Sequence, residues 1–165
     1  MRQDLTIRGK YALFYGQWPS NWEPSPFVID GKRYGCVEQW MMASKARLFG
    51  DKQAERHIME SPDPSDQKRY GRIVKGYDDR RWAAVRYKVV LQGTLEKYRQ
   101  NPHLMRKLLD TGGLVFVEAS PTDKIWGIGM RASDPNSGDP SKWRGQNLLG
   151  KAITEAKGIL MGETL

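Results

Sequence analysis

Hydrophobic positions recur at helical spacing through the middle of the chain and again near its end. The pattern predicts helices near residues 37–49, 51–60, 78–99 and 102–110 and a closing helix over NLLGKAITEAKGIL, with Asp63 or Ser65 as the cap of a further segment. The helix at 78–99 carries hydrophobic residues on two faces, so we expect it to be central and well covered.

Short extended runs and loops occupy the rest of the chain. FVIDGKRYG, residues 27–35, places Asp30-Gly31 between two such runs, which is a strong hairpin signal. LVFVEAS and KIWGIG, after Gly112-Gly113, are interpreted as two short strands. We therefore predict an α+β fold, mainly helical, in which a single domain packs a small sheet of short strands on its helices.

The first candidate for chemistry is the helix VEQWMMASKARLFG, residues 37–50, because Glu38 and Lys45 fall within its hydrophobic stripe. Charged residues are rarely buried without partners, so the apolar face either borders a site or ends in solvent at both tips. A carboxylate and an amine in apolar surroundings have perturbed pKa values and suit acid–base roles. Complementing the helix dipole is the competing explanation.

The second candidate is FVEASPTDKIWG, where Glu118 ends a predicted strand, Asp123 lies in the turn and Trp126-Gly127 open the next strand. Paired carboxylates can cleave a glycosidic bond, one acting at the leaving group and the other on water or the oxocarbenium ion. Alternatively, Asp123 forms only an Asx turn.

The third candidate is WRGQNLLG, in which Gly145 and Asn147 precede an apolar run. Backbone N–H groups at that helix start could bind phosphate, with Arg144 adding charge. An ordinary helix start is the alternative, since the glycines match neither the P-loop nor the dinucleotide fingerprint.

The net charge of +8 is concentrated in one helical region, since residues 65–107 hold 12 Lys and Arg against 4 Asp and Glu and the remainder holds 15 of each. Such a surface attracts phosphates, although it is also typical of a solvated helix face. One cysteine and two distant histidines make a poor zinc set, so we expect no metal and no cofactor. Without a signal peptide or a membrane span, a cytoplasmic protein with no membrane partner is predicted.

Several of these stretches together resemble the NADAR, or YbiA-like, family. They are FYGQWPSNWEPSPFVIDGKRYGCVEQWMMASKARLFGD, GRIVKGYDDRRWAAVRYKVV, FVEASPTDKIWGIG and SKWRGQNLLGKAI, and the resemblance covers about residues 11–160 in the correct order. It implies a domain over residues 11–162 after an N-terminal extension of residues 1–10. It also implies N-glycosidase activity on ADP-ribose or related N-ribosides.

The resemblance also implies site residues, position by position. The motif acid and lysine fall on Glu38 and Lys45, which with Glu118 and Asp123 are the candidate catalytic residues. Substrate contacts are expected for the remaining motif positions and nearby side chains: Ser20, Asn21, Trp82, Arg86, Trp126, Gly127, Arg144, Gly145 and Asn147. Gln39-Trp40 and Ser44 stand where some relatives have His-Tyr and Gln, which bears on substrate specificity.

Three functions follow from this resemblance. The first is removal of ADP-ribose from modified guanine in DNA or RNA. The second is cleavage of phosphoribosylamino-pyrimidine intermediates of riboflavin biosynthesis, and the third is a non-catalytic module that binds ADP-ribose or NAD. The presence of both Glu38 and Lys45 at motif positions argues against the third.

Overall fold

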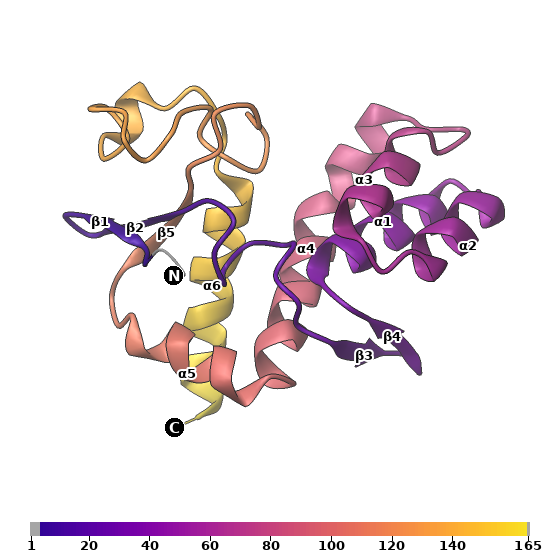
Figure 1. Cartoon of the computed structure of the whole chain (residues 1–165), viewed down its shortest axis with the longest axis horizontal. Coiled ribbons are helices and arrows are strands. Elements are labelled where there is room, and N and C mark those ends of the chain that lie inside the picture. Colours follow the sequence, from indigo (N-terminus) through magenta and orange to yellow (C-terminus); the bar gives the residue numbers. More distant parts are fainter. Residues whose placement is uncertain (1–3, 165) are drawn as a thin grey trace. The chain divides into compact units, whose positions relative to one another are not determined.

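The computed structural model describes residues 4–164; residues 1–3 of the predicted N-terminal extension and Leu165 lie outside the described part. Figure 1 labels the elements in chain order: β1 (Thr6–Arg8), β2 (Tyr11–Phe14), β3 (Phe27–Ile29), β4 (Lys32–Tyr34), α1 (Val37–Leu48), α2 (Lys52–Glu60), α3 (Pro64–Arg72), α4 (Asp79–Arg99), α5 (Pro102–Asp110), β5 (Val115–Glu118), the 3-10 turn η1 (Pro140–Lys142) and α6 (Leu148–Glu163). The predicted helices are all present, and Asp63 caps α3 by accepting a hydrogen bond from the backbone N–H of Ser65.

The described chain divides into two compact units. The first unit comprises residues 4–23 and 103–164, and the second comprises residues 24–102. Within residues 4–164, no helix combines the length and the hydrophobicity needed to cross a membrane.

The first unit contains a three-stranded sheet in the order β1-β2-β5. β1, from the predicted N-terminal extension, runs antiparallel to β2, whereas β5 runs parallel to β2 with Leu13 opposite Val117. Parallel strands need a long connection, and here the whole second unit and α5 lie between β2 and β5 in sequence. α6 packs along β5 and buries Ala152, Ile153 and Leu160 (Figure 1).

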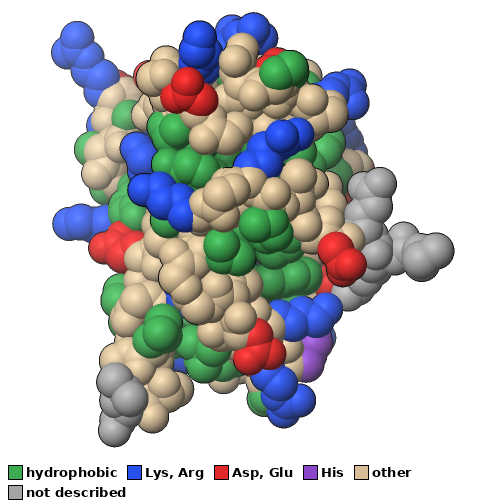
Figure 2. All heavy atoms as spheres, turned by 90° about the vertical axis from the view of Figure 1, so that its left-hand side faces the viewer, with side chains coloured by type: hydrophobic (Ala, Val, Ile, Leu, Met, Phe, Trp, Pro, Cys, Tyr) green, Lys and Arg blue, Asp and Glu red, His purple; other side chains and the backbone are tan. Residues whose placement is uncertain are grey.

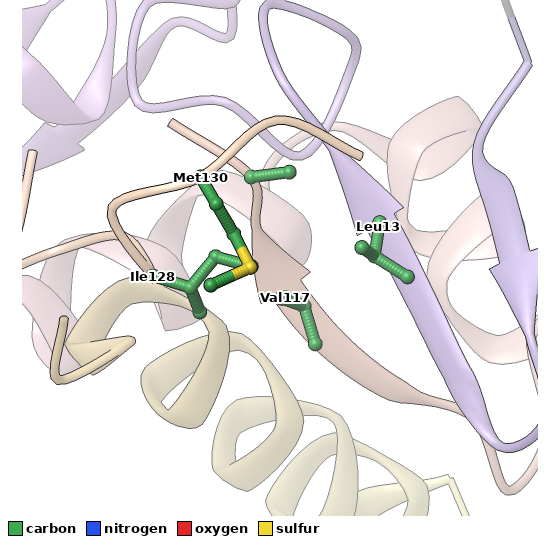
Figure 3. Packing of buried hydrophobic residues seen from close by; sticks show 5 residues of the cluster. Leu13, Val117, Ile128 and Met130 are labelled. Carbon is green, nitrogen blue, oxygen red and sulfur yellow. The ribbon is translucent and has the colours of Figure 1, made fainter. Parts of the chain in front are cut away.

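A hydrophobic cluster joins the sheet of the first unit to the segment that follows β5. It consists of Leu13, Val117, Ala119, Ile128 and Met130, and Figure 3 shows Ile128 and Met130 on this segment beside Val117 of β5. All five side chains are buried. Their burial fixes the segment after β5 against the sheet, although that segment has no regular structure of its own.

The prediction of a strand over KIWGIG is therefore wrong. The backbone at Ile128 donates one hydrogen bond to the Glu118 carbonyl, but Gly129 has φ +72°, outside the extended region. The carbonyls of residues 124–127 accept hydrogen bonds from residues 146–149 instead of forming a strand ladder. The hydrophobic residues of this run are buried, so periodicity alone could not separate a packed loop from a strand.

The second unit is organised around α1, which contacts α2, α3 and α4. Most of α1 is buried, including the Trp40 ring, whose Nε1 donates to the Val89 carbonyl of α4 at 2.7 Å. The expectation that the helix at 78–99 would be the central one is wrong, because the first two turns of α4 are largely exposed and α1 is the covered helix. Gly93 of α4 leaves room for the Trp40 ring at this crossing.

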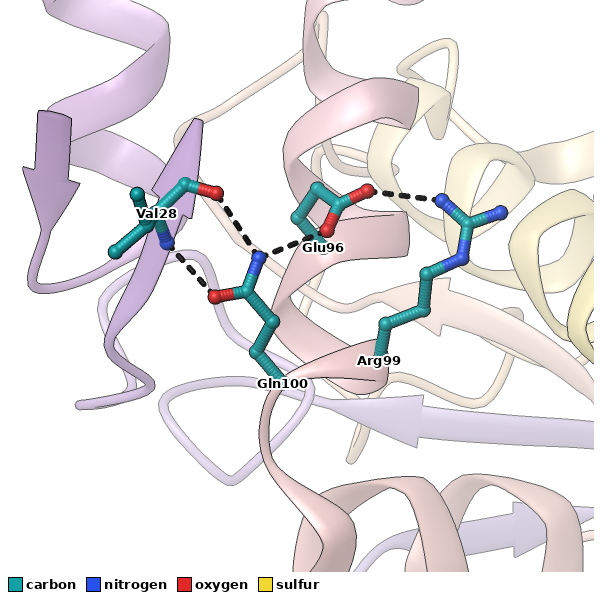
Figure 4. Close-up of polar contacts among 4 residues, drawn as sticks. All are labelled: Val28, Glu96, Arg99 and Gln100. Carbon is teal, nitrogen blue, oxygen red and sulfur yellow. Dashed lines mark hydrogen bonds and ion pairs between the residues drawn. The ribbon is translucent and has the colours of Figure 1, made fainter. Parts of the chain in front are cut away.

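The predicted hairpin is confirmed, with β3 and β4 joined by Asp30 and Gly31 at φ +51° and +77°. Both values are positive, as a type I′ turn requires. Figure 4 shows how the hairpin is attached to the end of α4: the Gln100 side chain accepts from the Val28 N–H at 2.8 Å and donates to the Val28 carbonyl at 3.0 Å. Gln100 also donates to Glu96. One amide thus serves as a partner for the open edge of β3.

The close approach of α4 to Trp40 gives a stability prediction. In Gly93→Ala the new methyl group meets the Trp40 ring, whose hydrogen bond to Val89 restricts its movement. We expect a loss of about 1–3 kcal/mol in the free energy of unfolding. The matched control is Gly158→Ala on α6, where a methyl group meets no atom within 4 Å. It should gain up to about 1 kcal/mol through helix propensity. Urea unfolding measures both, and equal stability of the two variants would contradict the packing argument.

Candidate active site

Glu38 lies in the first turn of α1 and is only 4% exposed. Its neighbours Val37 and Gln39 are buried as well, so this end of the helix is not a solvent-exposed tip. The interpretation that α1 ends in solvent at both tips is therefore wrong for its N-terminus. A carboxylate is favoured near a helix N-terminus, but burying it also requires specific polar surroundings.

Two glutamine side chains fix the backbone around Glu38. Gln39 accepts a hydrogen bond from the Gly35 N–H at 2.8 Å and donates to the Ile58 carbonyl at 3.0 Å, which ties the start of α1 to the end of α2. Gln67 of α3 donates to the Ser61 carbonyl at 2.8 Å and accepts from the Cys36 thiol. The start of α1 is thus held by buried amides from two directions, which restricts where the Glu38 carboxylate can lie.

Cys36, the N-cap residue of α1, is an unreactive neighbour of Glu38. Burial, reinforced by the charge of Glu38, raises the pKa of its thiol to about 11. At neutral pH the thiol is therefore protonated, and it can donate to Gln67. A protonated thiol is a poor nucleophile, so Cys36 offers no covalent chemistry here.

Lys45 lies near the other end of α1 and is half-buried. Burial lowers the pKa of its amine, the charges of Glu38 and Asp79 oppose that shift, and the charge of Arg72 reinforces it. The fraction of neutral amine at a given pH is consequently larger than for an exposed lysine. The charge of Glu38 therefore favours the protonated form of Lys45.

Arg47, in the last turn of α1, belongs to the framework and not to the site. Its guanidinium group pairs with Glu55 of α2 and donates to the Tyr34 hydroxyl at 2.7 Å. The Tyr34 ring packs edge-on against Trp40. These contacts agree with the helical spacing, which directs Trp40 and Arg47 away from the side of Glu38 and Lys45.

In the first unit, Glu118, Asp123, Trp126 and Gly127 are brought together by the segment after β5. The Oδ1 atom of Asp123 accepts from the N–H groups of Ile125 and Trp126 at 2.9 and 2.8 Å. The Asx-turn interpretation of Asp123 is thereby confirmed for this oxygen. A Cβ at position 127 would lie 2.9 Å from the carbonyl oxygens of Asp123 and Glu118, so a glycine there permits the close approach.

Asn147 is buried and links β5 to the start of α6. Its Oδ1 accepts from the Glu118 N–H at 2.9 Å, and its Nδ2 donates to the Phe116 carbonyl at 3.1 Å. The residue has φ +53°, a left-handed conformation that asparagine tolerates better than most residues. Its side chain therefore joins backbone groups within the fold.

The backbone N–H groups predicted to bind phosphate at this helix start are already used. Those of residues 146, 147, 148 and 149 donate to the carbonyls of residues 124, 127, 125 and 126. Gly145 packs so closely on Gly127 and Lys124 that a side chain would collide with their backbone. The phosphate cradle of free N–H groups is therefore wrong for these four positions, whereas the exposed Arg144 side chain stays accessible.

The other predicted binding residues differ in accessibility. Trp82 is only 5% exposed, as expected for a core side chain, whereas Trp126 and Arg86 are half-buried. Ser20 and Asn21 are buried, and the Ser20 hydroxyl accepts from the Trp22 N–H at 3.1 Å. Of the two tryptophans, Trp126 is the more accessible to a base.

A cavity of about 780 Å³ in the first unit is lined by none of the predicted site residues. Its wall includes Tyr15 and Trp18 together with Asp4, Glu23, Asp110 and Lys107. Three carboxylates against one ammonium group disfavour a phosphate-bearing ligand. The face drawn in Figure 2 likewise carries hydrophobic side chains in its middle, with charged side chains of both signs around them. The charges that line this cavity therefore disfavour it as the binding site of a phosphorylated substrate.

Two residues that the sequence analysis did not single out adjoin Lys45. The ring centroid of Tyr77 lies 4.5 Å from the Lys45 Nζ, and the Tyr77 hydroxyl donates to Asp79 at 2.8 Å. Tyr77 directly precedes Asp78, the N-cap residue of α4, and Asp79 is the first residue of that helix. No periodic signal indicates that this segment returns to the end of α1.

Comparison with known proteins gives the class of the chain, an α+β enzyme of the glycosidase class, because its relatives include N-glycosidases. The chain belongs to the NADAR domain family, whose model matches residues 13–161. An N-glycosidase of Acanthamoeba polyphaga mimivirus is 38% identical over 161 residues, covering 90% of this chain and 95% of that protein.

Two further likenesses extend this assignment. A chloroplastic riboflavin biosynthesis protein of Zea mays is 26% identical over 166 residues, covering 90% of this chain and 25% of that protein. The NMR structure of the Escherichia coli protein YbiA has a TM-score of 0.75 at 22% identity, covering 99% of this chain and 92% of that chain. The last likeness confirms the predicted fold class, a mainly helical α+β domain with small sheets.

The role of Asn147 in the fold gives a prediction that separates stability from binding. Asn147→Ala leaves the Glu118 N–H and the Phe116 carbonyl without their partner, so we expect a loss of about 2–4 kcal/mol in unfolding free energy. Asn147→Gly relieves the positive φ but loses the same hydrogen bonds, and should still be destabilised. Gln146→Ala, at an exposed position, is the control and should stay within about 0.5 kcal/mol of wild type. Urea denaturation without substrate measures the unfolding free energy of each variant. An Asn147→Gly variant as stable as wild type would contradict the role of Asn147 in linking β5 to α6.

Proposed function

We propose that this protein hydrolyses the bond between a nitrogen and the anomeric carbon of a ribose, and that its substrate is ADP-ribosylated guanine in DNA or RNA. The observation that carries the proposal is the buried Glu38 carboxylate and half-buried Lys45 amine on one face of α1, in a chain of a family with N-glycosidase members. The concentration of positive charge around α3 and α4 supports the choice of a nucleic acid as the substrate.

The chemistry of an N-ribosidic bond sets what the site must supply. Breaking the bond leaves positive charge on the ribose and requires a proton at the departing base. Glu38 would stabilise that charge or orient the attacking water. Asp123 and Glu118, which belong to the first unit, are separate candidates for the same roles. Lys45 would donate a proton to the leaving group, or its neutral amine would attack the anomeric carbon as the bond to the base nitrogen breaks and that nitrogen takes up a proton. Water would then hydrolyse the bond between the ribose and Lys45.

The remaining substrate contacts are proposed at the positions that the resemblance to the family implies. Trp126 would stack on a base, and Ser20 and Asn21 would hold ribose hydroxyls. Arg144 and Arg86 would hold phosphate through their side chains. Trp82, Gly127, Gly145 and Asn147 would support the site through packing, since their structural contacts occupy them.

Exposed basic residues favour a polymeric substrate. In the segment from α3 into α4 the exposed Lys and Arg residues are Arg69, Arg72, Lys75, Arg80, Arg81 and Lys88. Arg69 pairs with Asp66 at 3.1 Å, and Arg81 donates to the Leu48 carbonyl at 3.3 Å. A chain of phosphates could contact several of the others at once.

The catalytic assignment predicts a loss of activity without a loss of fold. Glu38→Gln and Lys45→Ala should each lower kcat on an ADP-ribosylated guanosine oligonucleotide by about 100-fold or more, since each removes a group that acts on the reacting atoms. Glu60→Gln and Lys52→Ala change the same residue types at exposed positions of α2 and should retain activity. Released ADP-ribose is measured by mass spectrometry and the fold by circular dichroism. Full activity of both site variants would contradict the assignment.

The alternative substrate is a phosphoribosylamino-pyrimidine, and the likeness to the Zea mays riboflavin biosynthesis protein is the observation that favours it. Such a metabolite offers one phosphate to the basic residues, whereas a nucleic acid offers several. The two substrates therefore differ in how strongly salt should weaken binding.

A salt titration distinguishes them. If the substrate is a nucleic acid, binding of a single-stranded oligonucleotide should weaken steeply with salt. Arg80→Ala with Lys88→Ala should then reduce the slope of log K against log salt by about 0.7 for each phosphate that the variant no longer neutralises. Fluorescence anisotropy gives the affinities, and Lys151→Ala, an exposed lysine of α6, is the control. If the oligonucleotide shows no detectable binding and the phosphoribosylamino-pyrimidine is turned over, the metabolite is the substrate.

A further inference from the structure

Lys45 has an aromatic neighbour that none of the sequence motifs indicated. Its Nζ lies 4.5 Å from the centroid of the Tyr77 ring, within the range in which a ring face attracts a cation. Tyr77 is 43% exposed, whereas Lys45 is half-buried. The ring therefore shields the amine from water on one side while its own other surface is open to solvent.

The Tyr77 ring is held in place from two directions. Its hydroxyl donates to Asp79 Oδ1 at 2.8 Å, and Asp79 is the first residue of α4. The ring of Phe49, which directly follows α1, packs at a centroid distance of 5.4 Å and an interplanar angle of 66°. The position of the ring is thus set by both the end of α1 and the start of α4.

The segment that carries Tyr77 is also anchored through its backbone. The two carboxylate oxygens of Asp51 have different partners: Oδ1 caps α2 at the Ala54 N–H, and Oδ2 accepts from the Lys75 N–H at 2.8 Å. Arg81 donates to the Leu48 carbonyl at the end of α1. Residues 75–81 are therefore fixed against the helix that carries Lys45.

From this geometry we propose that Tyr77 and Asp79 form a positioning pair for Lys45. The ring of Tyr77 holds the Lys45 amine in one place and limits its contact with water, and the Asp79 carboxylate holds the ring. This inference rests on the proposed function for the reaction that Lys45 serves, but the geometry of the pair can be tested in the free protein.

The charges around Lys45 make the pair distinguishable from ordinary packing. Glu38 on α1, Arg72 on α3 and Asp79 on α4 all act on the amine, together with the ring of Tyr77. The Tyr77 ring face attracts the ammonium form of Lys45, but burial is the largest influence on the pKa of this amine and lowers it. Removing the covering ring should therefore raise the pKa toward its ordinary value. Asp79 raises that pKa, so removing its charge should lower it further. The two members of the pair thus predict shifts of opposite sign.

Nuclear magnetic resonance of the free protein tests the geometry without any substrate. In wild type the Lys45 ε-methylene protons should show an upfield ring-current shift, which Tyr77→Phe keeps and Tyr77→Ala abolishes. The pKa of the Lys45 amine should rise in Tyr77→Ala and fall in Asp79→Asn. Tyr70→Ala is the matched control, because the Tyr70 ring stacks on His57 instead and should leave both readings unchanged. An unchanged ring-current shift and pKa in Tyr77→Ala would overturn the proposal.

Turnover supplies the second arm. Tyr77→Ala should lower kcat by about tenfold to 100-fold, as expected when a reacting group is displaced, while KM changes less. Its pH profile should move toward higher pH, and Tyr77→Phe should recover most of the rate. If Tyr77→Ala does not fold, Tyr77→Phe and Asp79→Asn carry the test through the ring-current shift and the fall in pKa.

The two hypotheses fail in different ways. If the wild-type protein cleaves no N-ribosidic substrate but Lys45 shows the predicted shifts, the proposed function is wrong and the pair stands. If the wild type is active and the Tyr77→Ala variant retains both its pH profile and its kcat, the positioning role is wrong and the proposed function stands.

Discussion

The second unit is organised around the buried first turn of its covered helix, which carries the Glu38 carboxylate. Removing a charge from water is costly, and Glu38 at 4% exposure has to be stabilised by its surroundings. The helix N-terminus contributes partial positive charge, and the amides of Gln39 and Gln67 fix the adjoining backbone. These amides also join α1, α2 and α3, so the polar groups that position Glu38 are the same ones that hold three helices together. A change at Glu38 would therefore act on a site that is rigid before substrate arrives.

In the first unit, too, buried polar groups need hydrogen-bond partners, and backbone groups supply most of them. The segment after β5 has few repeating hydrogen bonds, and a buried loop of this kind must find partners for its carbonyls elsewhere. It finds them in the N–H groups at the start of α6, while the side chain of Asn147 bonds to the backbone of β5. The helix N-terminus, which in isolation would attract an anion, is here saturated by the protein itself. Motif residues such as Asn147 can thus be required for the fold without contacting a ligand, which the residues around them do not reveal.

The sequence predicted most of the local structure and part of the site because its signals are local. Asp30-Gly31 sets a hairpin, and helical periodicity relates Glu38 and Lys45 within one element. The errors concern what packs against what: KIWGIG has the composition of a strand, but its carbonyls bind the start of α6, and the two-faced helix at 78–99 is less covered than α1. Tyr77 was missed because its contact with Lys45 spans 32 positions and depends on how the segment after α3 returns to α1. Sequence spacing contains no information about such a return.

The unequal burial of Glu38 and Lys45 bears on which of the two can exchange protons. A carboxylate that is almost fully enclosed keeps one environment throughout a reaction, which suits stabilising positive charge at an anomeric carbon. A half-buried amine with a lowered pKa gives up its proton more readily than an exposed lysine. In the proposed reaction the carboxylate would accordingly act through its fixed charge and the amine through its changing one. Each charge stabilises the other, so loss of the proton from Lys45 would remove a positive charge that stabilises the Glu38 carboxylate. Bond cleavage and proton transfer would therefore be coupled through α1.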